Sequence, residues 1–254
     1  MKSGSLFISA LFYGLLMLVN PVVSLAGSPF LTDDPEPGEY RHLEFYIASQ
    51  SQITRHTKNI TTPHFEINYG VLPDVQLHLI TPFCYSQNDE VKHYGYGDTE
   101  LGIKWRFMNE SEYIPMMGIF PMVQVPTGNE NKGVGNGNAQ YYIPLWIQKK
   151  REKWLSYGGG GYWINQGKNN NNYWFAGWQI QRQIKESLSL GIEVFHRKAS
   201  KSGDKNSTGF NIGAVINFSE LHHMLFSAGR DVVGPNTFTS YVSYQLTIGP
   251  GDFE

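Results

Sequence analysis

The residues best suited to chemistry alternate with apolar residues along short segments. In the clearest segment, Asp98, Glu100, Lys104 and Arg106 share one parity and lead up to Phe107. Carboxylates and cations on one face can orient a polar solute, or they can pair with one another and fill a narrow space. Other segments repeat the pattern with further polar side chains. We predict that these residues line a common interior: Glu66, Asp98, Glu100, Lys104, Arg106, Glu193, Asn211 and Asn217.

Metal-binding and catalytic arrangements are poorly supported. His42, His64 and His78 fall on the polar parity of three successive segments, and they could share a metal only if the segments align them. Histidines scattered through the interior are the alternative, and we predict no metal site. The chain lacks G-x-S-x-G and H-E-x-x-H motifs, so we predict no catalytic residues, no enzyme activity and no cofactor. The single cysteine, Cys84, excludes an intramolecular disulfide.

The elements that carry these residues are predicted to be β-strands. Between Thr99 and Phe107, apolar and polar residues alternate strictly, and a strand sorts such a pattern onto two faces whereas a helix scatters it. The same period recurs at 188–195, 210–218 and 238–248. Since no apolar helical period is sustained, the sequence predicts an all-β fold.

The connections between these segments indicate how the strands are joined. Short connections fall near 71–74, 108–112, 150–153, 184–187 and 219–221, and long ones near 54–59, 86–96, 126–138, 165–171, 199–206 and 231–236. Alternation of short and long connections is typical of an up-and-down antiparallel barrel with periplasmic turns and extracellular loops. We therefore predict about twelve strands, with both termini in the periplasm.

The N-terminal region divides into two parts before the barrel. Residues 1–26 read as a cleaved signal peptide, with Lys2, an apolar run over 11–19, and Ser24 and Ala26 at the cleavage site. An uncleaved anchor helix is the alternative, but the apolar run is shorter than the roughly 20 residues of a membrane span. Residues 27–38 hold three prolines and are predicted to be a periplasmic lead-in, and the barrel is predicted to occupy 39–254.

Composition favours a membrane barrel over a soluble one. Only 17% of residues are charged, which is too few for the surface of an ordinary soluble domain, and 14% are aromatic. Aromatic side chains form belts at both membrane interfaces, and Trp105, Trp154 and Trp174 are predicted to lie there. The expected partners are outer-membrane lipid and the barrel-assembly machinery. A net charge of −2 offers no basic surface for nucleic acid.

Three motifs resemble a known family. The lead-in PFLTDDPEP at 29–37, the segment GDTELGIKWRF at 97–107 and PTG at 126–128 are similar to outer-membrane proteins grouped as the MetA-pathway of phenol degradation family. The resemblance covers essentially the mature chain. Many outer-membrane barrels end on an aromatic residue within the last strand. This sequence departs from that pattern, because GPGDFE follows the last predicted strand.

The resemblance implies an outer-membrane protein of a Gram-negative bacterium that acts as a channel or uptake protein for small solutes, among them aromatic or hydrophobic compounds. It does not identify the solute. Two other functions stay open from the sequence: a non-conducting structural or adhesive barrel, and a secreted soluble β-domain.

Overall fold

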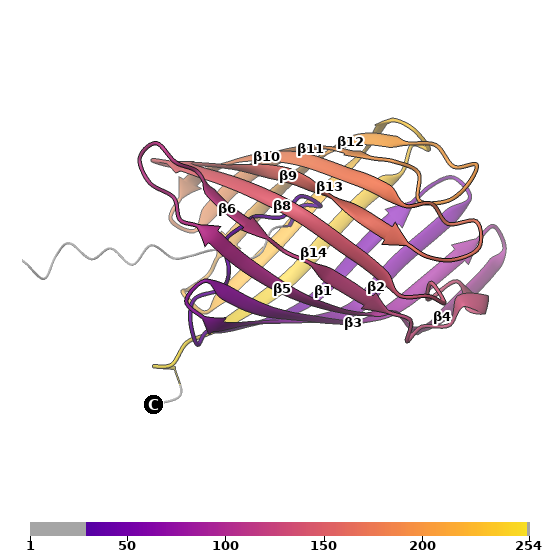
Figure 1. Cartoon of the computed structure of the whole chain (residues 1–254), viewed down its shortest axis with the longest axis horizontal. Helices are drawn as coiled ribbons and strands as arrows, with labels where there is room; N and C mark the ends of the chain where they lie inside the picture. Colours follow the sequence, from indigo (N-terminus) through magenta and orange to yellow (C-terminus); the bar gives the residue numbers. More distant parts are fainter. Residues whose placement is uncertain (1–28, 253–254) are drawn as a thin grey trace, which may run out of the picture.

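The computed structural model describes residues 29–252, and the predicted signal peptide at 1–26 lies outside these residues. The described chain is a closed antiparallel β-barrel, whose long axis is horizontal in Figure 1. Its only helix is one 3-10 turn, η1 (Glu130–Lys132). Among residues 29–252, no helix has the length and apolarity of a transmembrane span.

Fourteen strand segments form the wall. Their bounds are β1 Leu43–Ile53, β2 Thr57–Leu72, β3 Val75–Asn88, β4 Val91–Tyr96, β5 Thr99–Met108, β6 Met116–Ile119, β7 Met122–Val125, β8 Gln140–Arg151, β9 Trp154–Asn165, β10 Tyr173–Lys185, β11 Leu188–Arg197, β12 Ser207–Asn217, β13 His222–Val233 and β14 Phe238–Ile248.

These segments form twelve wall strands, because two of the strands are interrupted. β4 and β5 pair in turn with β3, and β6 and β7 both pair with β5 on one side and β8 on the other. β1 pairs with β14 along its whole length, from Leu43↔Ile248 to Ile53↔Phe238, so the sheet has no free edge. The predictions of an all-β fold and of twelve strands are confirmed.

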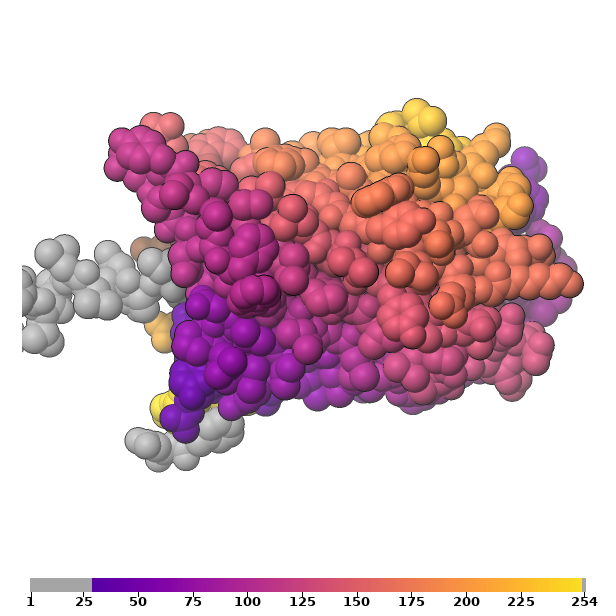
Figure 2. All heavy atoms as spheres, viewed as in Figure 1, coloured from indigo at the N-terminus to yellow at the C-terminus, as the bar shows by residue number. Residues whose placement is uncertain are grey.

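The two faces of the wall are inverted relative to a soluble barrel. On β5, Ile103 is 50% exposed on the outside whereas Lys104 is 3% exposed inside. On β11, Val194 is 57% exposed and Glu193 is completely buried. An apolar exterior around a polar interior is the arrangement that a bilayer requires. The atoms of the wall pack into a continuous outer surface on the face seen in Figure 2.

Some connections differ from the prediction. The expected long loops near 54–59 and 86–96 are wrong: β1 and β2 are joined by residues 54–56 alone, and β3 and β4 form a hairpin turning at 89–90. The connection from β5 to β6, predicted to be short, covers residues 109–115. Polar residues such as Asn59 and Gln87 pair within β2 and β3, so these strands continue past the points where their apolar pattern ends.

Candidate functional site

Residues 29–38 lie inside the barrel, and we call this segment the plug. Glu193 on β11 is its main receptor. The Glu193 carboxylate accepts hydrogen bonds from Leu31 N at 3.2 Å, and from Thr32 N and Thr32 Oγ1 at 2.5 Å each. Asn211 Nδ2 completes the set at 2.6 Å. A buried carboxylate is thus satisfied mainly by the plug rather than by a cation.

A second set of contacts holds the acidic half of the plug. Lys104 Nζ lies 3.0 Å from Asp33 Oδ1 and 3.4 Å from Asp34 Oδ1. Burial raises the pKa of the Asp34 carboxyl to about 7, although the nearby Lys104 ammonium opposes this shift. Two further hydrogen bonds join wall and plug: Gln148 of β8 donates to Glu36, and Gly38 N of the plug donates to Gln76 of β3. The described part of the segment predicted as a periplasmic lead-in therefore lies in the lumen, against side chains of the wall.

Glycines on three neighbouring strands make room for the plug. A Cβ atom on Gly177 of β10 would overlap Thr32 Oγ1. A Cβ on Gly191 of β11 or Gly213 of β12 would lie 3.0 Å or 2.9 Å from the Phe30 ring. Gly191 and Gly213 face each other across the strand pair. The wall is therefore shaped to accept the plug at this height.

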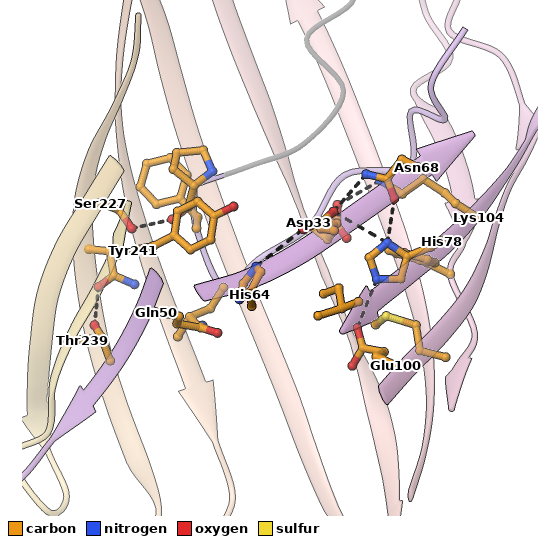
Figure 3. A pocket seen from close by; sticks show the side chains of 18 of the residues that line it. Asp33, Gln50, His64, Asn68, His78, Glu100, Lys104, Ser227, Thr239 and Tyr241 are labelled. Carbon is orange, nitrogen blue, oxygen red and sulfur yellow. Dashed lines mark hydrogen bonds and ion pairs between the residues drawn. The ribbon is translucent and has the colours of Figure 1, made fainter. Parts of the chain in front are cut away.

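Beside the plug remains an interior cavity of about 180 Å³. Its polar lining comes from β2, β3 and β5 on one side and from β1, β12, β13 and β14 on the other; most of these side chains are drawn in Figure 3. Its apolar lining includes Phe30 and Leu31 of the plug, together with Phe120 and Met122. The cavity is comparable in size to one of about 150 Å³ that binds benzene. It can therefore hold a solute of about one ring.

Two histidines and two glutamates form the polar end of this cavity. His78 Nε2 lies 3.2 Å from Glu100 Oε1, and His78 Nδ1 lies 3.6 Å from Glu66 Oε1. His64 Nε2 lies 4.0 Å from Glu66 Oε2, which is too long for a hydrogen bond. Among the described residues, no group of three or more His, Cys, Asp or Glu side chains has a metal-binding arrangement.

A second cavity, of about 620 Å³, opens on the outer face of the wall, and we call it the recess. It is lined almost entirely by apolar side chains of β2, β3, β5, β7 and β8: Ile67, Tyr69, Leu77, Leu79, Leu101, Ile103, Val123 and Tyr141. Pro121, His78, Gly102 and Met122 complete its lining.

The recess coincides with a weak place in the sheet. Pro121 has no N–H group to donate, and the strand is interrupted there between β6 and β7. Pro144 on β8, which lies in the facing strand, also lacks a donor. His78 and Met122 line both the recess and the interior cavity. His78 and Met122, together with the Gly102 backbone and the Phe120 ring that lies against it, therefore stand between the lipid-facing recess and the lumen.

The structure places the predicted interior residues in three groups. Glu66, Glu100, Lys104 and Asn211 line the interior cavity, and Glu193 binds the plug behind it. Arg106 lies at the short-turn end, where it binds Asp74. Asn217 is at the same end, next to the turn at 186–187. Asp98 is at the long-loop end, where its carboxylate accepts from Gly128 N and Asn136 N and holds the 126–139 loop.

The predicted interfacial tryptophans face outward. Trp154 begins β9 directly after a short turn and Trp174 lies near the start of β10 after a long loop, at opposite ends of the barrel. Trp105 is 48% exposed and lies three residues before the end of β5, toward the short-turn end of the barrel. Trp146, in contrast, is buried inside and packs against Phe175.

Several site residues were not predicted from the sequence. The plug itself, Phe120, Met122 and Tyr241 were missed, and His64 and His78 were noted only as scattered interior histidines. The inward glycines at 177, 191 and 213 were the available signal for the plug, since three small residues on one parity of adjacent strands leave a space that another segment fills.

Solved structures with the same fold are outer-membrane barrels. An outer membrane channel from Pseudomonas putida F1 matches with a TM-score of 0.71 and 17% identity, over 85% of this chain and 98% of that one. The NanC porin matches with a TM-score of 0.57 and 6% identity, over 80% and 98% of the two chains. The KdgM porin in complex with disordered oligogalacturonate has a TM-score of 0.56 and 9% identity, over 79% and 98%.

The search of curated proteins found no match. The family model described as "Putative MetA-pathway of phenol degradation" matches residues 35–245, which is most of the chain, from the end of the plug to β14. The protein therefore belongs to the family of the putative MetA-pathway of phenol degradation, as its motifs suggested.

Proposed function

We propose that the protein carries small, largely apolar solutes, including aromatic ones, across the outer membrane, and that they enter the lumen through the recess. The observation that carries this proposal is the pair of cavities that share His78 and Met122. A solute dissolved near the lipid meets an apolar hollow, and a floor of few side chains separates that hollow from the interior.

The plug argues against a wide hydrophilic pore. A water-filled channel requires a continuous open lumen, whereas here residues 29–38 occupy the centre and leave about 180 Å³ beside them. A non-conducting structural barrel would need no apolar hollow in its wall. The membrane-facing exterior leaves no support for the secreted soluble β-domain.

Entry of a reporter solute into the periplasm tests this function. Phenyl acetate is apolar and has one ring, and an esterase placed in the periplasm of intact cells would report its entry by releasing phenol. We expect faster hydrolysis in cells that produce the barrel than in cells that do not, at equal esterase levels. Liposome swelling in arabinose should be slow with the same protein. Rapid arabinose flux without a gain in phenyl acetate entry would identify a hydrophilic pore instead.

A further inference from the structure

The polar end of the interior cavity contains a donor without a hydrogen-bond partner. His64 is 5% exposed, and its Nε2 makes no hydrogen bond within the described chain. Nδ1 of the same ring lies 3.2 Å from Thr61 Oγ1. An unpaired polar atom buried this deeply is costly, so its role needs an explanation.

The surroundings of His64 indicate which tautomer is present. If Thr61 donates to Nδ1, then Nε2 carries the proton and faces the Glu66 carboxylate at 4.0 Å. The opposite tautomer would direct a lone pair at a carboxylate, which is repulsive. Nε2 is therefore a hydrogen-bond donor, and Glu66 Oε2 is an acceptor placed just beyond its reach.

A hydroxyl group fits between these two atoms. It can accept from Nε2–H and donate to Oε2 at the same time, which neither an ammonium group nor a hydrocarbon can do. An oxygen about 2.8 Å from both atoms would see them at an angle of about 90°, which suits a hydroxyl. Figure 3 shows His64 projecting into the space between Tyr241 and the His78 side of the cavity.

The rest of the cavity suits the body of such a molecule. Phe30, Leu31, Phe120 and Met122 supply apolar surface, and the Tyr241 ring lies 6.2 Å from the His64 ring. We infer that the cavity is a binding site for single-ring solutes that carry a hydroxyl group, with His64 and Glu66 as the pair that recognises this group. The inference rests on the proposed function, because it names the class of solute held along the proposed route.

Three single-ring probes of similar size test the inference with the purified full-length barrel in nanodiscs: benzyl alcohol, toluene and benzylamine. Binding is followed by the imidazole NMR signals of histidine-labelled protein. We expect benzyl alcohol to bind at least about tenfold more tightly than toluene, because the hydrocarbon leaves His64 Nε2 and Glu66 Oε2 without a hydrogen-bond partner. His64→Phe and Glu66→Leu should each bring this ratio toward one. His64→Gln, whose amide can donate in the same place, should restore part of it.

His196→Phe is the matched control, because His196 faces outward on β11 and binds Thr208. It should leave the ratio unchanged, and heat-modifiable gel migration would confirm that each variant is folded. Equal binding of toluene and benzyl alcohol by the wild type, or an alcohol preference that survives in His64→Phe, overturns the inference. So does tighter binding of benzylamine, or no binding of benzyl alcohol, in which case the cavity takes only water. Phenyl acetate entry is measured separately, so the proposed function can fail while the site stands.

Discussion

Replacing Glu193 should release the plug, and the size of the effect follows from its contacts. Three of the four hydrogen bonds to this carboxylate come from Leu31 and Thr32 of the plug. A hydrogen bond to a charged group contributes about 1.5–3 kcal/mol, but water can replace part of this in an opened lumen, so we take about 1 kcal/mol each. Glu193→Leu then weakens seating of the plug by about 3 kcal/mol, which is about a 100-fold change in the equilibrium.

A buried cysteine on the plug reports its release. Pro29 is buried, so Pro29→Cys in a Cys84→Ala background should react with a water-soluble maleimide only when the plug is unseated. When reseating is faster than labelling, the labelling rate follows the unseated fraction. We expect about a 100-fold faster rate with Glu193→Leu and an intermediate rate with Glu193→Gln, which keeps one carbonyl acceptor.

Glu186→Leu is the matched control, because Glu186 is exposed in the turn between β10 and β11. It should leave the labelling rate of Pro29→Cys unchanged. A rate for Glu193→Leu within about twofold of the parent protein would refute the hydrogen-bond reasoning, since it would mean that the plug is held by other contacts.

Two more predictions concern the plug. Gly177→Val places a side chain where Thr32 now lies, so we expect higher single-channel conductance in planar bilayers; unchanged conductance would show that the plug is already displaced in the membrane. Raising the pH from about 5 to 8 should also favour release, because the seated Asp34 has its pKa raised to about 7 and holds a proton that the free carboxyl gives up near its usual value. Asp33, Glu36 and Lys104 surround this group. Because maleimide reacts with the thiolate, each rate is divided by that of a solvent-exposed cysteine in the same barrel at the same pH. Asp34→Asn should make this corrected rate independent of pH over the range, and a corrected rate that falls as the pH rises in the parent protein would contradict the assignment.

Much of the barrel could be predicted from its sequence, because the wall repeats a period of two that only a strand can use. Lys104 between Ile103 and Trp105 is a clear example: two lipid-facing residues flank one that must face inward. Strand ends were harder to predict where polar residues pair on both sides. Beyond the membrane-spanning region the apolar pattern fades while the hydrogen-bonded ladder continues, as in β2 and β3.

The interior could not be predicted in the same way, because it depends on contacts between distant residues. Thr32 and Glu193 are 161 positions apart, and nothing in the local pattern of either indicates the other. Likewise, the alternating pattern predicts that His64 and Glu66 both face inward. It does not predict the 4.0 Å separation between His64 Nε2 and Glu66 Oε2. Of the predicted lining residues, Lys104 and Glu193 bind the plug instead of facing an open pore.

The proposed route through the wall is tested most directly at Met122, the flexible side chain shared by the recess and the interior cavity. Phenyl acetate entry into intact cells is the measurement, with Met122→Trp to block the floor of the recess and Met122→Ala to open it. Met224→Trp is the matched control, since Met224 alternates with the inward His223 on β13, far from the recess. We predict slower entry with Met122→Trp, faster entry with Met122→Ala and no change with Met224→Trp. Equal entry rates for all three variants would contradict a route through the recess.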